Sequence, residues 1–148
     1  MFRFAIVVSR FNEEITEGLL KGALDCFAER SVPRDAVTIY RVPGAFEIPL
    51  MAKRLADSGE YDAVVCLGCL IKGETMHFEY IAEAASHGIA EAAVATGVPM
   101  AFGVLTTTTE EQALERSRPG AANKGREAAA AALEMAALFR QLDEGIGG

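Results

Sequence analysis

The sequence has no hydrophobic run that approaches the roughly 18 residues of a membrane-spanning helix. Its first residues, 1–8, are apolar only briefly before Ser9 and Arg10, which is too short for a signal segment. It also has no excess of positive charge, because 14 Lys and Arg stand against 21 Asp and Glu, a net charge of −7. That balance disfavours wrapping nucleic acid, which needs a basic face. We therefore expect a cytoplasmic protein with neither a membrane nor a nucleic acid as its partner.

Cysteine is scarce, and the common nucleotide-binding motifs are missing. Cys66 and Cys69 have a Cys-x-x-Cys spacing, and Cys26 is the only other cysteine. Zinc needs four ligands, but there is no second cysteine pair and no close set of histidines. A redox pair usually opens a helix, whereas these residues flank the end of an apolar run. Buried thiols are the simpler interpretation, and no metal is expected. The absence of a Walker loop and of Gly-x-Gly-x-x-Gly argues against nucleotide hydrolysis and hydride transfer.

The 148 residues do contain an alternation of strand-like and helix-like segments. Near-continuous apolar runs at 3–9, 37–42, 62–69 and 100–105 predict strands buried on both faces, as in parallel sheets. Helical patterns cover 13–30, 46–58, 78–96, 109–117 and 124–142. This alternation predicts an α/β protein of one domain, 1–148, with a four-stranded parallel sheet inside a three-layer αβα sandwich.

Three helix starts carry capping signals. Asn12 is a candidate cap for the first helix, and Thr109 with Gln112 forms a Thr-x-x-Gln capping box for the fourth. Asn123 is a candidate cap for the last helix, whose residues Leu133, Ala137 and Phe139 are expected to face the core.

The unusual residues follow the predicted strands, whose carboxyl ends meet at one sheet edge, where such folds bind ligands. Phe11 and Phe46 lie outside periodic core positions, and two aromatic faces could hold a flat heterocycle. The alternative is a hydrophobic staple for Phe11 and ordinary packing for Phe46. Glu47 is a charge in an apolar segment, either a hydrogen-bond acceptor for a ligand or a surface carboxylate.

Histidine and a group of cations complete the candidate chemistry. His77 follows the third strand and could transfer protons near neutral pH, although a lone histidine is more often structural. Arg116, Lys124 and Arg126 surround the break between the last two helices, where a helix N-terminus could receive a phosphate. The other interpretation is a solvated helix end.

In their order and spacing, five segments closely resemble the lumazine synthase family. They run from about residue 4 to residue 142: Ser-Arg-Phe-Asn at 9–12, Val-Pro-Gly-Ala-Phe-Glu-Ile-Pro at 42–49, Gly-Glu-Thr-Met-His-Phe-Glu-Tyr at 73–80, Phe-Gly-Val-Leu-Thr at 102–106, and Glu-Gln-Ala-Leu-Glu-Arg at 111–116 with Asn-Lys-Gly at 123–125. The family has a flavodoxin-like fold. The link at 117–122 departs from the family's usual glycine- and lysine-containing stretch, and the chain has little of the N-terminal extension found in many relatives.

The resemblance implies an enzyme of riboflavin biosynthesis. The family condenses 5-amino-6-(D-ribitylamino)uracil with 3,4-dihydroxy-2-butanone 4-phosphate to give 6,7-dimethyl-8-ribityllumazine, phosphate and water, without a cofactor. By this resemblance, the residues that hold the pyrimidine and its ribityl chain are Phe11, Ala45, Phe46, Glu47, a turn of Cys69, Leu70 and Ile71, and Phe102. Those near the butanone phosphate are Glu74, Thr75, Arg116 and Lys124, and His77 matches the proton donor.

In this family the site lies between neighbouring subunits of a homo-oligomer, a pentamer or a multiple of pentamers. The resemblance then implies that Phe102, Arg116 and Lys124 act in the neighbour's site. Two other interpretations stay open: a flavin- or lumazine-binding module without turnover, and a shell-forming protein on the same scaffold. The joint presence of Phe11, Glu47, His77, Arg116 and Lys124 favours the enzyme.

Overall fold

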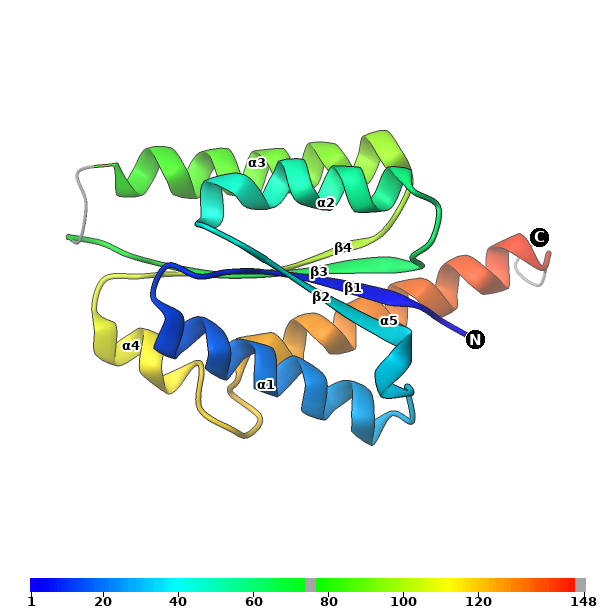
Figure 1. Cartoon of the computed structure of the whole chain (residues 1–148), viewed down its shortest axis with the longest axis horizontal. Coiled ribbons are helices and arrows are strands. Elements are labelled where there is room, and N and C mark those ends of the chain that lie inside the picture. The colour runs from blue at the N-terminus through cyan, green and yellow to red at the C-terminus, as the bar shows by residue number, and fades with distance from the viewer. Residues whose placement is uncertain (74–76, 146–148) are drawn as a thin grey trace.

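The computed structural model describes residues 1–73 and 77–145. Its sheet has four parallel strands in the order β2-β1-β3-β4 (Figure 1). They are β1 (Phe4–Ser9), β2 (Val37–Val42), β3 (Ala63–Ile71) and β4 (Met100–Thr107). Phe4 lies opposite Val37 on one side and Ala63 on the other, so β1 and β3 form the centre and β2 and β4 the edges.

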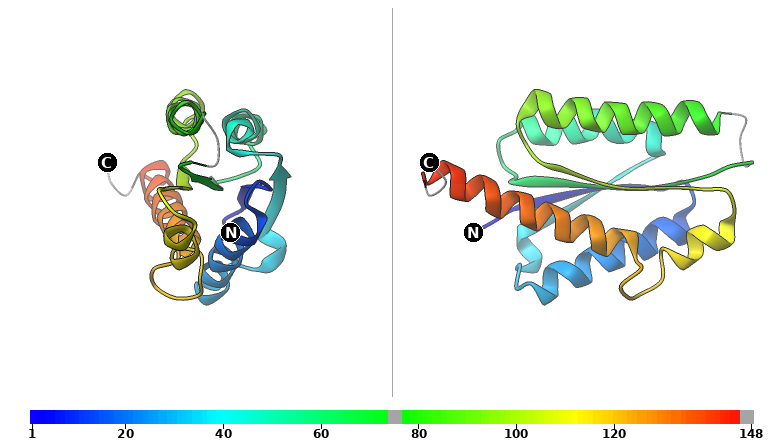
Figure 2. Two further views of the ribbon diagram at one scale, coloured as in Figure 1. Left: turned by 90° about the vertical axis from the view of Figure 1, so that its left-hand side faces the viewer. Right: turned by 180° about the vertical axis from the view of Figure 1, so that it is seen from behind.

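Helices cover both faces of the sheet, which confirms the predicted three-layer αβα sandwich (Figure 2). One face carries α1 (Glu13–Glu29), α4 (Glu110–Glu115) and α5 (Lys124–Asp143), and the other carries α2 (Ile48–Asp57) and α3 (Phe78–Thr96). Two short 3-10 helices, Arg34–Ala36 and Ala45–Glu47, precede β2 and α2. In the described part of the chain, no helix combines the length and apolar character needed to cross a bilayer.

The strand period of two divides the interior into two apolar cores. Ile6 and Val65 pack toward α1 and α5, whereas Val7 and Val64 pack toward α2 and α3. All nine residues of β3 are buried, which explains its continuous apolar sequence. Full burial of one such side chain contributes about 1.5–3 kcal/mol, so the central strands anchor the turns at their ends.

Two strands run further than the sequence predicts. β3 ends at Ile71 and β4 at Thr107, and these two residues are partners in the parallel ladder. The expected turn at Cys69, Leu70 and Ile71 is therefore wrong: these residues are the last three of β3, and their side chains are buried. Their paired main-chain groups and their apolar side chains both favour extension of the strand.

The expected core face of α5 is wrong for Phe139, which is exposed, whereas Leu133 is half-buried and packs against the core. The fully buried residues of α5 are small: Gly125, Ala128, Ala129, Ala132 and Ala136. The reason is close packing, since a Cβ added to Gly125 would overlap the main chain of Leu19 in α1. Large side chains are excluded from this contact and lie to either side of it.

Candidate active site

Hydrogen bonds tie the carboxyl ends of the four strands together. The Phe11 N–H donates to the Pro43 carbonyl at 3.1 Å, which joins the turns after β1 and β2. The Lys72 N–H donates to the Thr107 carbonyl at 2.8 Å, which joins β3 to β4. The predicted gathering of all four strand ends at one edge is confirmed, and Figure 1 shows this edge on the left.

Asn12 links the middle of this edge in a way that the sequence did not reveal. Its backbone is left-handed, with φ 62° and ψ 49°, and its side chain makes no capping hydrogen bond to α1. The predicted side-chain cap is therefore wrong. Instead the Asn12 amide donates to the Cys69 carbonyl at 3.0 Å. Asparagine is one of the few residues that adopts this backbone conformation readily, which explains its use here.

The two candidate aromatic residues are surface residues, not core residues. Phe11 is 53% exposed and Phe46 62% exposed, so neither is held by packing inside the sandwich. Phe46 lies in the 3-10 helix before α2, where its neighbour Ala45 is buried and fixes the segment against the sheet. Both flat apolar faces are thus available at the strand-end edge.

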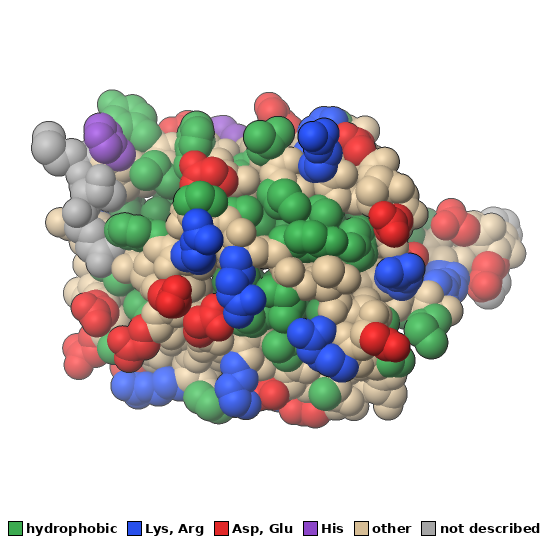
Figure 3. Space-filling model, viewed as in Figure 1, with side chains coloured by type: hydrophobic (Ala, Val, Ile, Leu, Met, Phe, Trp, Pro, Cys, Tyr) green, Lys and Arg blue, Asp and Glu red, His purple; other side chains and the backbone are tan. Residues whose placement is uncertain are grey.

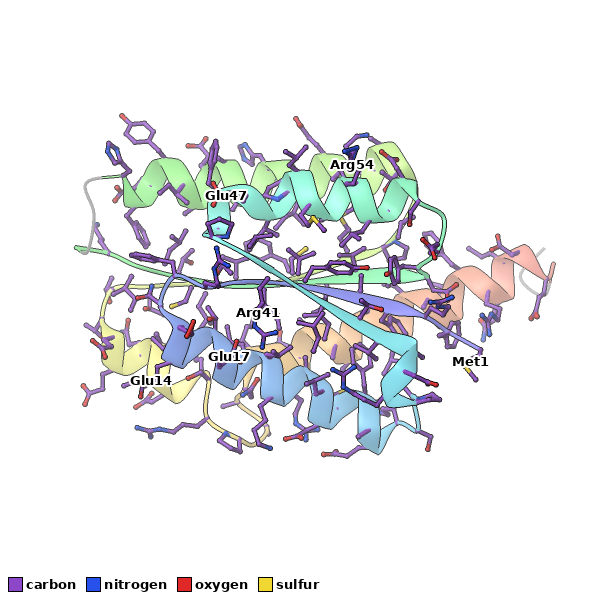
Figure 4. All side chains as sticks on the ribbon, viewed as in Figure 1. Met1, Glu14, Glu17, Arg41, Glu47 and Arg54 are labelled. Atoms are coloured by element: carbon purple, nitrogen blue, oxygen red, sulfur yellow. The ribbon has the colours of Figure 1, made fainter. Side chains whose placement is uncertain are left out.

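Glu47 is half-buried at the start of α2, with its carboxylate folded toward Gly44. A negative charge at a helix N-terminus interacts favourably with the helix dipole. Figure 4 places Glu47 above Arg41 of β2, which pairs with Glu17 of α1 at 3.0 Å. Glu47 also borders a surface cavity of about 490 Å³ that it shares with Val42, Leu50, Met51, Lys53, Arg54 and Asp57. Hydrophobic side chains gather at the surface between α2 and β2 (Figure 3).

His77 is exposed at the N-cap position of α3, and its carbonyl accepts from the Ile81 N–H at 3.0 Å. The histidine ring thus lies at the strand-end edge, on the side of α3. Glu74 and Thr75, which the resemblance assigns to the butanone phosphate, lie outside the described residues. Beyond β3, a shallow cavity of about 620 Å³ lies between α3 and β4 and is lined in part by Lys72, Phe102 and Thr106.

The candidate phosphate cluster lies on the outer flank of β4. Phe102, Arg116 and Lys124 line one cavity of about 430 Å³, together with Val104, Leu105, Thr106, Ala122 and Glu127. Arg116 follows the end of α4, and Lys124 is the first residue of α5, where the helix dipole favours an anion. The Lys124 Nζ lies 3.1 Å from Glu127, while no carboxylate in 1–73 or 77–145 pairs with Arg116.

The structure thus divides the candidate residues into two clusters. The inner cluster comes from the ends of β1, β2 and β3 and comprises Phe11, Ala45, Phe46, Glu47 and the Cys69–Ile71 strand end, with His77 beyond it. The outer cluster is Phe102, Arg116 and Lys124, beyond the edge strand β4. Within one chain the cavity of the outer cluster includes no side chain of the inner cluster.

The cysteines are buried thiols, as predicted. Cys66 packs toward α2 and α3 and Cys69 toward α1, so the two side chains of the Cys-x-x-Cys spacing lie on opposite faces of the sheet. Burial raises the pKa of Cys66 to about 12 and also raises the pKa of Cys26, which disfavours the reactive thiolate. Among the described residues, no three His, Cys, Asp or Glu side chains form a group suited to a metal ion.

Two residues near the clusters were missed as site residues. Thr106 is exposed and borders both cavities beside Phe102. The sequence could have indicated it, because Thr106 follows Phe102 and Val104 at alternate positions and a strand places such positions on one face. Asn123 was predicted only as a helix cap, a role that is confirmed by the Arg126 N–H donating to its side chain at 3.0 Å.

The strand order, the covered parallel sheet and the two clusters of aromatic, acidic and cationic side chains define an α/β enzyme of flavodoxin-like architecture. The model of the 6,7-dimethyl-8-ribityllumazine synthase family matches residues 1–140. The chain belongs to this family.

Curated relatives agree with this assignment. A 6,7-dimethyl-8-ribityllumazine synthase of Chloroherpeton thalassium is 53% identical over 140 residues, covering 95% of this chain and 90% of the relative. The protein named 6,7-dimethyl-8-ribityllumazine synthase 1 of Caulobacter vibrioides is 56% identical over 142 residues, covering 96% and 93%. The synthase of Syntrophus aciditrophicus is 54% identical over 140 residues, covering 95% and 91%.

Proposed function

We propose that this chain condenses 5-amino-6-(D-ribitylamino)uracil with 3,4-dihydroxy-2-butanone 4-phosphate to form 6,7-dimethyl-8-ribityllumazine, phosphate and water. The observation that carries this proposal is the family match over residues 1–140. No observation favours the two alternatives, a binding module without turnover and a shell protein. The reaction setting that we propose is the cytoplasm, where thiols such as those of Cys26 and Cys66 stay reduced.

The inner cluster would hold the pyrimidine. The exposed rings of Phe11 and Phe46 offer flat faces for a heterocycle. The Glu47 carboxylate would accept hydrogen bonds from ribityl hydroxyl groups, beside Ala45. Main-chain groups of Cys69, Leu70 and Ile71 would fix the ring edge, because the side chains of these residues are buried and cannot do so.

The outer cluster would hold the phosphate. Arg116 can bind an oxyanion with two parallel N–H donors, and Lys124 adds a charge at the start of α5. Phe102 lies in the same cavity and would contact the pyrimidine from the other side. Glu74 and Thr75 would complete the phosphate end.

The chemistry then needs little beyond alignment and proton transfer. The amine of the pyrimidine attacks the ketone, and water leaves as the imine forms. Phosphate is eliminated, and the second amine closes the ring with loss of water. His77 would carry protons among these nitrogen and oxygen atoms, an effect typically worth about 10²–10⁴-fold. Alignment of the two substrates can supply about 7–11 kcal/mol.

We further infer that a whole site forms between two subunits of a cyclic homo-oligomer, a pentamer or a multiple of it. Phe46 and Glu47 of the inner cluster follow the edge strand β2, whereas the outer cluster lies beyond the opposite edge strand β4. A head-to-tail ring brings such opposite edges together. The apolar surface between α2 and β2 would then be part of the contact. The whole chain, 1–148, would act as one domain of the ring.

The direct test mixes the purified protein with both substrates and follows lumazine absorbance or fluorescence. Product formation well above the spontaneous rate supports the proposal, and a rate equal to that of a protein-free control overturns it. Mass measurement in solution tests the ring, for which five copies of the 15.8-kDa chain or a multiple are expected. A monomer with full activity would contradict the shared site.

A further inference from the structure

We propose that Asn123 is a positioning residue for the phosphate cluster, fixing Arg116 and Lys124 by fastening their connecting loop to α1. This inference rests on the proposed function, since it assigns Asn123 to the use of the phosphorylated substrate. Asn123 is 1% exposed and therefore cannot touch that substrate. It acts through the residues that line the cavity.

The Asn123 amide nitrogen lies within hydrogen-bond distance of three main-chain carbonyls, which share its two N–H groups. It lies 3.0 Å from the Ser117 oxygen, 3.0 Å from the Arg118 oxygen and 3.1 Å from the Gly18 oxygen. The first two belong to the loop directly after Arg116, and the third belongs to the second turn of α1. One side chain therefore joins α1 to the loop that connects Arg116 with Lys124, which we call the phosphate loop.

The opposite end of the same side chain fixes Lys124. The Asn123 carboxamide oxygen accepts from the Arg126 N–H at 3.0 Å and so caps α5, whose first residue is Lys124. The Lys124 N–H in turn donates to the Arg116 carbonyl at 2.9 Å. The main chains of the two cationic residues are thus joined directly. The Asn123 side chain makes hydrogen bonds just after Arg116, to Ser117 and Arg118, and just after Lys124, to Arg126.

Three glycines allow α1 to come close enough for these bonds. A Cβ at Gly22 would overlap the Asn123 carboxamide, and one at Gly18 would lie 2.5 Å from the Ser117 oxygen. A Cβ at Gly125 would overlap the main chain of Leu19. The loop therefore sits directly on the backbone of α1, a rigid surface, and not on flexible side chains.

Helix capping alone does not require asparagine at this position. Aspartate and serine are equally good N-caps, because each supplies the acceptor for the Arg126 N–H. Only asparagine also supplies an amide that donates to the loop carbonyls. A carboxylate in its place would face three carbonyl oxygens without a donor, and the loop would move away from α1.

The test compares N123D and N123S with the parent enzyme in steady-state kinetics. Both variants keep the α5 cap, and we expect KM for the butanone phosphate to rise about tenfold in N123D and less in N123S, since small displacements of binding groups have large effects. KM for the pyrimidine should stay within about twofold, because the Asn123 side chain is hydrogen-bonded to none of Phe11, Phe46 and Phe102. Inhibition by inorganic phosphate should weaken in parallel.

Two controls separate the possible failures. L20A removes a buried side chain from α1, the helix that carries the phosphate loop. When its loss of melting temperature equals that of N123D, the ratio of its KM for the butanone phosphate to its KM for the pyrimidine should equal the parental ratio. R116A should reproduce the selective loss if the phosphate cluster is correct. An unchanged KM for the phosphate substrate in N123D, beside an affected R116A, overturns the positioning role alone. An inactive parent enzyme overturns the proposed function, whereas an unaffected R116A in an active parent overturns the assigned phosphate cluster and with it the role of Asn123. If L20A also raises KM for the butanone phosphate while KM for the pyrimidine stays unchanged, the effect of N123D comes from lost stability, and Asn123 is a structural residue only.

Discussion

The Asn12 side-chain nitrogen lies 3.0 Å from the main-chain oxygen of Cys69, 57 residues further along the chain. This bond crosses from the turn after β1 to the end of β3. It fixes the strand end whose main-chain groups would hold the edge of the pyrimidine. A residue type that ordinarily caps a helix through its side chain is used here to hold the end of a strand.

Substitution of Asn12 should therefore affect both stability and pyrimidine binding. N12A loses a hydrogen bond worth about 1 kcal/mol and strains a left-handed backbone by about 1–2 kcal/mol. N12G relieves the strain but not the missing bond, so its loss should be nearer 1 kcal/mol. Urea unfolding measures both. KM for the pyrimidine should rise in both variants, and an unaffected KM would show that the bond serves folding alone.

Loss of the Arg116 side chain should weaken use of the phosphorylated substrate. A charge-assisted hydrogen bond to an oxyanion contributes about 1.5–3 kcal/mol, so R116A should raise KM for the butanone phosphate about 10- to 100-fold. R116K keeps the charge but not the paired donors and should be intermediate. The matched control is R118A, which removes an exposed cation two residues away. Equal effects of R116A and R118A would contradict a specific phosphate site.

Removal of the His77 ring should slow turnover without abolishing it. Alignment of the substrates does not depend on this ring, so H77A should lose about 10²-fold in kcat and stay above the spontaneous rate. H87A removes an exposed histidine from the same helix, α3, and should behave like the parent. An H77A enzyme with the parental kcat would mean that the histidine has no part in proton transfer.

Mixed rings test whether the two clusters come from different subunits. F11A damages the inner cluster, and R116A with K124A damages the outer one, so each variant alone should have low activity. If they are unfolded together in equal amounts and reassembled, about one quarter of the shared sites should receive two intact halves. Activity should then exceed the average of the two separate preparations. No gain, in mixtures shown to co-assemble by mass, would contradict shared sites.

Burial of Cys66 predicts a loss of stability at alkaline pH. The folded state raises the pKa of this thiol from 9.0 to about 12, so between these values the unfolded chain releases a proton that the folded chain keeps. The free energy of unfolding should therefore fall as pH rises through this window, by up to about 1.4 kcal/mol per pH unit from this group.

C66A should flatten that decline while leaving the part due to Tyr40, whose hydrogen bond with Tyr61 raises its pKa to about 12. Denaturant unfolding at several pH values between 8 and 12 provides the comparison. A decline of equal slope in C66A and the parent would contradict the assignment.

The sequence predicted the architecture well because the core imposes a simple pattern. β3 is buried throughout, so its residues had to be apolar, and Thr109 with Gln112 marked the start of α4 by a local motif that the structure retains. Such features depend on near neighbours and on burial, and both leave a direct trace in the order of residue types.

Features that depend on close approach of distant segments were not predicted. Phe139 was expected in the core, but α5 packs on α1 through glycine and alanine, and only the neighbouring helix makes small residues the correct choice. Asn12 was expected to cap α1, and its partner at Cys69 lies on another strand. The separation of Phe102, Arg116 and Lys124 from the other candidate residues was expected only from the family resemblance, because it follows from which strand lies at which edge.

One helix touches both clusters. The turn before α1 is hydrogen-bonded to the end of β3 through Asn12, while Gly18 and Gly22 lie against the loop between Arg116 and Lys124. Since a helix has a fixed rise of about 1.5 Å per residue, α1 sets the distance between these two contacts. If the two clusters bind the two substrates as proposed, a substitution that tilts or bends α1 would displace both of them.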